Sequence, residues 1–217
     1  MLKFWLLILV LVAFMFAGRT SSSAPATESY SEESYTEEGY AEEETSEAYA
    51  TDQNSIFSEM PSHFSFLSGA GGWSTELTIN QDGSFTGAFH DSDMGSSGED
   101  YDATVYVCNF EGQFSVVEQV DDYTYKLKID WMSQNESEGE TWIEDRVQYI
   151  ASIPYGLENA QDIMLYLPGR TTSDLTEDCI SWIFMAEGWS YDTPGETLSH
   201  YVLYNVNAGE AFTSNDW

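Results

Sequence analysis

Residues 72–87 read GWSTELTINQDGSFTG, and their pattern is typical of a β-hairpin. Trp, Thr, Leu and Ile occupy every second position over 73–79, which is the periodicity of a strand with one buried face. The pair Asp82-Gly83 accepts the positive backbone angles of a tight turn. We therefore expect an antiparallel return strand over residues 84–90.

Similar alternation, interrupted by turn residues, continues along the chain. The further strands expected are 103–110, 113–120, 123–131, 142–152, 162–167 and 199–206, with a short one near 210–213. A turn at Glu111-Gly112 separates the first two of these, and in the third Tyr123 and Trp131 are expected to face inward. Apolar residues at helical spacing after Ser173 predict one short helix that ends near residue 183.

Seven or eight short strands and one short helix indicate a mainly β fold. Closure of a meander into a barrel removes the exposed strand edges that would otherwise pair with other chains. We therefore expect a small antiparallel meander barrel or a half-open barrel. A two-sheet β-sandwich is the alternative.

The stretch 72–87, with HDSDMG at 90–95, PYG at 154–156 and LYLPG at 165–169, resembles an uncharacterised extracytoplasmic domain of Gram-positive bacterial proteins. Its opening Trp and hairpin are also similar to the first hairpin of lipocalin-like secreted barrels. The resemblance implies a lipocalin-like barrel with an enclosed cavity, outside the cytoplasm. The first family has no known activity to carry over to this chain.

The first 26 residues are expected to be a signal peptide or an N-terminal anchor. One basic residue, Lys3, precedes an apolar segment over residues 4–17, as in a secretion signal. That segment is shorter than the roughly 20 residues needed to span a bilayer. The protein is therefore expected to be secreted or anchored at the cell surface, with membrane contact only through residues 1–20 if the leader is uncleaved.

Residues 27–52 form an acidic tract of Glu, Ser, Thr and Tyr without lysine or arginine. Such a segment has too little apolar surface to offset the entropy cost of folding, so we expect a disordered stalk. Residues 53–217 then form a single β-rich domain, and they carry 28 acidic residues against four basic ones. This surface would repel phosphate backbones, so nucleic acid is not an expected partner.

Three sets of residues are candidate sites. The loop after the first hairpin is a candidate calcium site, because carboxylates on a flexible loop suit a hard cation, and a solvated loop is the alternative. Its members are Asp91, Asp93, Glu99, Asp100 and Asp102. Exposed rings of Trp142, Trp189 and Tyr191 would stack on a ligand, or alternatively cover the core. Cys108 and Cys179 form a disulfide or remain buried thiols.

The chain lacks a nucleophile elbow, a zinc-ligand pair and a phosphate-binding loop. We therefore expect no catalytic residues, and no cofactor other than calcium. The expected function is a non-catalytic, secreted or surface-displayed domain that binds a small molecule, a glycan or a protein outside the cell. The alternatives are an extracellular hydrolase that uses carboxylates and a purely structural surface domain.

Overall fold

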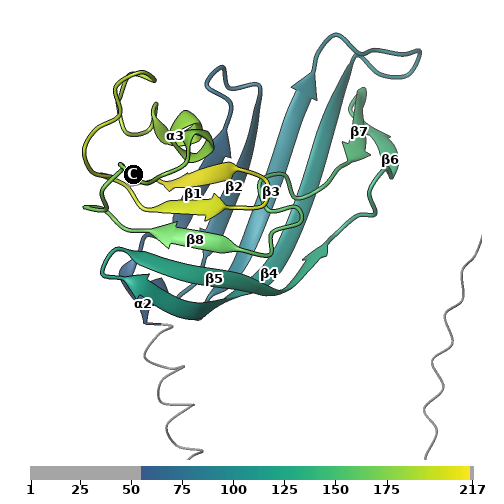
Figure 1. Ribbon diagram of the computed structural model, residues 1–217. Coiled ribbons are helices and arrows are strands. Elements are labelled where there is room, and N and C mark those ends of the chain that lie inside the picture. Colours follow the sequence, from purple (N-terminus) through teal and green to yellow (C-terminus); the bar gives the residue numbers. More distant parts are fainter. Residues whose placement is uncertain (1–54, 216–217) are drawn as a thin grey trace, which may run out of the picture. The chain divides into compact units, whose positions relative to one another are not determined.

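The computed structural model describes residues 55–215 (Figure 1), and the predicted leader (1–26) and stalk (27–52) lie outside the described residues. Within this range the chain forms ten strands and two short helices. In chain order the elements are α2 (Ile56–Glu59), β1 (His63–Leu67), β2 (Trp73–Ile79), β3 (Ser84–Asp93), β4 (Ala103–Asp121), β5 (Thr124–Gln134), β6 (Thr141–Glu144), β7 (Val147–Ala151), β8 (Ile163–Tyr166), α3 (Glu177–Ile183), β9 (Val202–Asn205) and β10 (Glu210–Ser214).

Eight of the described strands close into an antiparallel barrel. Around the barrel the order is β1, β2, β3, β4, β5, β8, β9 and β10, and β10 pairs back with β1. The chain follows this order as a meander that only the β6–β7 hairpin interrupts. The prediction of a mainly β fold with a small antiparallel barrel is confirmed, and the two-sheet sandwich is not formed.

The opening hairpin forms as its sequence predicts. Gly83 has a φ of 81°, in the region that favours glycine, at the turn between β2 and β3. The carboxylate of Asp82 accepts hydrogen bonds from the backbone N–H and the hydroxyl of Ser84, at 2.9 and 2.7 Å. The turn therefore fixes a register in which Thr78 lies opposite Thr86.

The predicted turn at Glu111-Gly112 is wrong, because β4 runs unbroken through both residues. Glu111 pairs with Thr86 and Gly112 pairs with Phe85. A Cβ atom at position 112 would lie 2.4 Å from the Phe85 ring and 2.6 Å from the carbonyl oxygen of Trp131. This glycine allows close packing inside a strand and does not turn the chain.

The inward positions predicted for Tyr123 and Trp131 are also wrong. Ile129 and Trp131 pair with successive residues of β4, so Asp130 is an extra residue that makes a β-bulge. The bulge turns Trp131 to the outer face, where it is 50% exposed. Tyr123 lies in the turn before β5 and is 47% exposed.

The strand predicted over 142–152 is instead the β6–β7 hairpin. Asp145 and Arg146 have φ angles of 49° and 64°, as a two-residue type I′ turn requires. The Arg146 guanidinium donates hydrogen bonds of 2.8 and 2.7 Å to the Asp102 carboxylate. Because β7 runs parallel to residues 103–107 of β4, the hairpin extends the barrel wall at one end (Figure 1).

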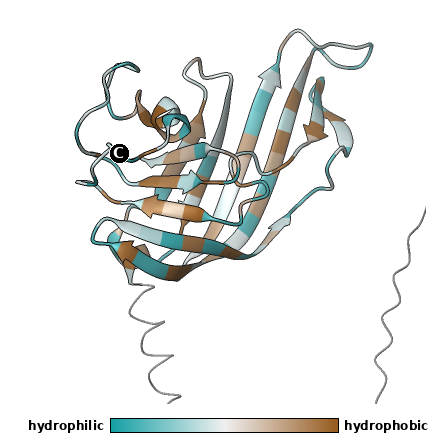
Figure 2. Cartoon of the chain, in the orientation of Figure 1, coloured by the Kyte–Doolittle hydropathy of each residue, from teal (hydrophilic) through white to brown (hydrophobic). Residues whose placement is uncertain are grey.

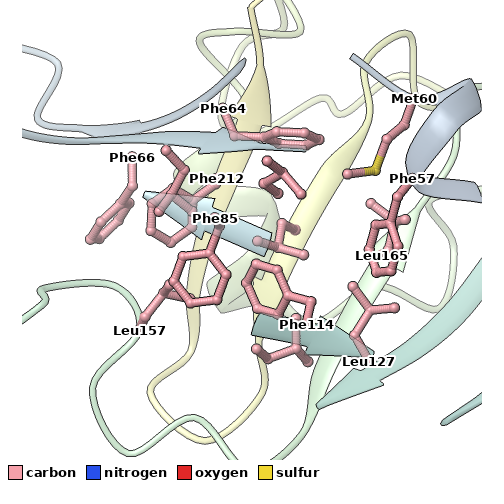
Figure 3. Packing of buried hydrophobic residues seen from close by; sticks show 14 of the residues in the cluster. Phe57, Met60, Phe64, Phe66, Phe85, Phe114, Leu127, Leu157, Leu165 and Phe212 are labelled. Carbon is pink, nitrogen blue, oxygen red and sulfur yellow. The ribbon is translucent and has the colours of Figure 1, made fainter. Parts of the chain in front are cut away.

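Side chains from all eight barrel strands fill the barrel interior. Hydropathy alternates along the strands in Figure 2, and Figure 3 shows the buried rings pointing between the strands. The strand residues in this cluster are Phe64, Phe66, Leu77, Ile79, Phe85, Phe89, Cys108, Phe110, Phe114, Leu127, Ile163, Leu165, Leu203 and Phe212. These side chains occupy the space where the lipocalin-like resemblance implies a ligand cavity.

The two short helices cover different parts of the barrel. Ile56, Phe57 and Met60, on α2 and at its end, are buried in the interior cluster and close one barrel end. Cys179 and Ile183 of α3 instead join a second cluster on the outside of β9 and β10. The helix starts later than predicted, with Thr176 and not Ser173 as its N-cap.

Candidate functional site

Strands β2, β3 and β4 place a band of polar side chains side by side on the outside of the barrel. Because side chains alternate along a strand, residues between buried core positions point outward. The ladder then sets Glu76 beside Ala88 and Ala88 beside Asn109. At the next outward-facing positions, two residues further along each strand, Thr86 lies between Thr78 and Glu111. We call this surface, with its extension on β6 and β7, the outer wall.

The outer wall contains a shallow depression of about 380 Å³. The residues that line it are Glu76, Thr78, Thr86, Gly87, Ala88, Asn109, Phe110, Glu111 and Asn135. The depression forms where the wall carries small residues, Gly87 and Ala88. The Phe110 ring fills the space under Gly87, because a Cβ there would lie 2.2 Å from the ring.

Several polar groups in the depression are not used by the protein itself. The exposed side chains of Thr86, Asn109, Glu111 and Asn135 make no hydrogen bond to another residue within 55–215. By contrast, Glu76 accepts a hydrogen bond from the hydroxyl of Ser65. The depression therefore presents amide donors, a hydroxyl and carboxylate acceptors to a ligand.

The β6–β7 hairpin adds an aromatic pair to the same wall. Trp142 pairs with Tyr149 across the hairpin, and Tyr149 pairs with Val105 of β4. The two rings stack with centroids 5.3 Å apart and planes 13° apart, and both side chains are partly exposed. Val105 and Asn109 share one strand face and lie about 13 Å apart, at ~3.3 Å per residue. Tyr149 and Trp142 lie one and two strands beyond Val105, so the aromatic pair is further than this from the depression.

Of the aromatic residues predicted to bind a ligand, the structure places only Trp142 on the outer wall. Trp189 and Tyr191 lie in the loop after α3, on the other side of the barrel from β6 (Figure 1). Trp189 is partly buried and packs against the α3 cluster. Tyr191 is 57% exposed and contacts the Phe184 ring edge-on at 5.8 Å. The three rings are therefore not brought together.

The carboxylates of the predicted calcium site are spread along the end of β3 and the following loop. Asp102 is engaged by Arg146, and Asp93 accepts a hydrogen bond from the backbone N–H of Gly95 at 3.0 Å. Among residues 55–215, no group of three or more His, Cys, Asp or Glu side chains is arranged to hold a metal ion. Calcium binding by Asp91, Glu99 and Asp100 with these two residues stays a prediction.

The structure has both cysteines as buried free thiols. Cys108 lies in the interior cluster, whereas Cys179 lies in the α3 cluster outside the barrel wall. Burial raises the pKa of the Cys108 thiol to about 11 and that of Cys179 to about 12. The structure therefore has the arrangement of the alternative, two buried thiols that act as small apolar groups, and the Cys108–Cys179 disulfide stays a prediction.

A pair of carboxyl groups lies at the barrel end that the loop 152–162 covers. Glu210, at the start of β10, is 8% exposed and shares the inward face with Phe212. Burial, with the charge of Glu158, raises the pKa of the Glu210 carboxyl to about 7, and a hydrogen bond from Tyr155 opposes this rise. Burial also raises the pKa of Glu158. The pair can therefore hold a proton near neutral pH.

Sequence reasoning did not single out Asn109, Glu111, Glu158 or Glu210. Asn109 follows an apolar residue, Cys108, in an alternating segment, and this pattern indicates that Asn109 faces outward. The turn predicted at Glu111-Gly112 is wrong, and it places Glu111 outside the strand that carries Asn109. Glu158 and Glu210 meet only through barrel closure and the loop that covers it, and no local pattern indicates this.

Searches against protein-family models, curated proteins and solved structures found no match for this chain. Neither helix within residues 55–215 is long and apolar enough to cross a membrane. Function is therefore inferred from the outer wall and from the charge of the domain.

Proposed function

We propose that this protein is a non-catalytic binding domain outside the cytoplasm, and that its outer wall binds a neutral glycan. The observation that carries the proposal is the combination of unused hydrogen-bonding side chains and a stacked aromatic pair on one sheet face. The location follows from the predicted leader. The packed barrel interior favours a ligand on the outside of the barrel.

The chemistry of the depression suits sugar hydroxyl groups, each of which both donates and accepts hydrogen bonds. The amides of Asn109 and Asn135 offer donors and acceptors, and the Glu111 carboxylate offers acceptors. An apolar sugar face can pack on the partly exposed Trp142 ring. The two features lie more than about 13 Å apart, and this separation suits an oligosaccharide that contacts both.

Charge favours a neutral ligand over an anionic one. Each of the four basic residues within 55–215 is already paired with a carboxylate, at N–O distances of 2.7 to 3.0 Å. The pairs are Lys126–Asp162, Lys128–Asp130, Arg146–Asp102 and Arg170–Asp174. A sulfated or phosphorylated glycan would meet the wall carboxylates Glu76 and Glu111 without a free cation.

The test is binding of the labelled full-length protein to an array of neutral and sulfated oligosaccharides, followed by calorimetric titration of the strongest neutral binder. The double variant N109A/E111A should weaken binding at least tenfold, and W142A should weaken it by a similar factor. Gln81→Ala removes an exposed amide from the β2–β3 turn and is the matched control, with unchanged affinity expected.

Circular dichroism and melting temperatures confirm that each variant is folded. Because Trp142 also stacks on Tyr149, N109A/E111A is the primary variant and W142A supports it. The proposal is wrong if no neutral oligosaccharide binds, if only sulfated ones bind, or if N109A/E111A binds as tightly as the parent chain.

A further inference from the structure

The loop 152–162, which we call the cap, is tied across one end of the barrel by hydrogen bonds. The Thr75 hydroxyl donates to the carbonyl of Tyr155 at 2.7 Å. The buried amide of Asn205 donates to the carbonyls of Gly156 and Glu158 at 3.1 and 3.3 Å. At the end of the cap, the Asn207 side chain accepts from two backbone N–H groups. The cap is therefore held at several points to β2 and to the β9–β10 turn.

The cap also packs into the mouth of the barrel. The Tyr155 ring lies 5.2 Å from Phe66, 5.0 Å from Trp73 and 5.5 Å from Phe89, measured between ring centroids. Gly156 has a φ of 96°, and a Cβ there would lie 2.6 Å from the Phe212 ring. The closed cap thus covers aromatic rings that an open cap would expose to water.

Glu210 lies beneath this cap with one oxygen unsatisfied. Its side chain is more than nine-tenths buried, and Oε2 has no hydrogen-bond partner in the described part of the chain. The Tyr155 side chain donates a hydrogen bond to the same carboxyl group. A neutral carboxylic acid tolerates this position, but a carboxylate with an unpaired oxygen is costly there.

The charged groups that the structure places around Glu210 are acidic. Glu158 lies on the cap itself, and its carboxylate accepts the Gly156 N–H at 2.7 Å. Two further acids lie nearby without acting on Glu210 directly. Asp91 of β3 acts by its charge on Tyr155, and Asp178 of α3 lies against Gly209 from the outside of the barrel. Ionisation of Glu210 therefore adds like-charge repulsion to the cost of a buried charge.

We propose that the cap is a pH-controlled cover of the barrel mouth, closed while Glu210 is protonated and loosened when Glu210 ionises. The ligand that controls it is a proton, which fits the packed surroundings of Glu210 without displacing a ring. Loosening exposes the apolar mouth around Phe66, Trp73 and Phe89. This device is separate from the outer wall and does not rest on the proposed glycan binding.

The direction of the effect follows from the pKa of Glu210, which burial raises from 4.5 to about 7. Below the ordinary glutamate pKa, both the closed and the open cap hold the proton, and the closed form has its full stability. As the pH rises toward and through 7, the open cap releases the proton more readily, so the closed cap loses stability. Over the whole pH range the closed-to-open ratio falls by about 300-fold, which is the factor that a pKa difference of about 2.5 allows.

Hydrogen exchange of the full chain, followed by mass spectrometry from pH 5.5 to 8.5 and corrected for intrinsic rates, tests the proposal. Protection of the cap amides should fall about tenfold between pH 6 and 8, relative to the amides of β2. In Glu210→Gln, a neutral residue of the same shape, cap protection should depend on pH much less than in the parent chain, with Glu158 as the remaining buried carboxyl group of the cap. Glu196→Gln removes an exposed carboxylate elsewhere and should behave like the parent chain.

A second variant keeps the test decisive if Glu210→Gln folds poorly. Glu158→Gln removes the neighbouring charge that helps raise the pKa of Glu210, so the fall in protection should move to lower pH and become smaller. The proposal is overturned if cap protection in the parent chain does not depend on pH. It is equally overturned if Glu210→Gln keeps the same dependence.

Discussion

The two cysteines behave as apolar core residues, because both thiols are buried in apolar surroundings. A thiol must lose its proton to become nucleophilic, and burial in apolar surroundings opposes this. With a pKa of about 11 for Cys108 and about 12 for Cys179, no more than about one thiol in a thousand is ionised at pH 8. Both side chains are also shielded from reagents, at 3% and 1% exposure.

We therefore expect no reaction of the native protein with a thiol reagent at pH 8, and two reactive thiols per chain after unfolding in guanidinium without reductant. The measurement is absorbance of the released chromophore, with the reduced, unfolded chain as the reference for two thiols. A yield of zero thiols after unfolding would show that Cys108 and Cys179 form a disulfide after all.

Individual residues could be assigned to a face from sequence only where the strand is regular. Leu127 is buried, as its alternating segment predicts. Trp131, in the same segment, is turned outward by the bulge at Asp130, and the bulge depends on the partner strand. Gly112 resembles a turn residue in the sequence, because its packing partner, Phe85, is distant along the chain.

The start of α3 depends on one side chain that also contacts the barrel. The Thr176 hydroxyl accepts a hydrogen bond from the Cys179 N–H at 3.2 Å, as an N-cap does, and lies 2.8 Å from the Tyr204 hydroxyl of β9. The predicted cap, Ser173, lies one turn earlier and has the same chemistry. The contact with Tyr204 is specific to Thr176 and fixes where the helix begins.

Thr176→Ala should lower the free energy of unfolding by about 1 kcal/mol, because it removes the cap and leaves the Tyr204 hydroxyl without this partner. Thr176→Ser keeps the hydroxyl and should retain most of the stability, whereas Ser173→Ala should have little effect. Urea unfolding followed by circular dichroism measures all three. Equal losses in Thr176→Ala and Ser173→Ala would contradict the assignment of the cap.

Elements with local signals were predictable, and those that depend on partners were not. The β2–β3 hairpin follows from its alternation and from Asp82-Gly83. β1 was missed because its five residues offer only Phe64 and Phe66 as an alternating pair. The β6–β7 turn was missed because Asp145-Arg146 lacks the glycine that usually marks a type I′ turn.

The outer wall and the barrel mouth are properties of the whole molecule. The wall needs the register of three strands and the parallel pairing of β7 with β4, which brings Tyr149 beside Val105. The mouth needs the β9–β10 hairpin, which pairs Glu210 with Asn205. It also needs the hydrogen bonds from Thr75 and Asn205 that hold the cap across the barrel end. The sequence shows that these residues are acids and aromatics. It does not show that they lie close together, because their proximity arises from pairing between strands that are distant in sequence.

The charge of the domain is the other property that belongs to the whole molecule. Within residues 55–215, 27 acidic residues face four basic ones, and all four are paired. Mutual repulsion of the remaining carboxylates destabilises the compact state. Salt shortens the range of this repulsion from about 30 Å at 0.01 M to about 10 Å at 0.1 M.

The melting temperature at pH 7 should therefore rise between 0.01 M and 0.1 M sodium chloride.

At constant ionic strength, millimolar calcium should raise the melting temperature further than magnesium only if the carboxylates of the loop after β3 bind calcium specifically. Asp100→Asn should then remove the calcium effect, while the control Glu196→Gln should keep it. Equal effects of calcium and magnesium would leave charge screening as the full explanation and contradict the calcium site.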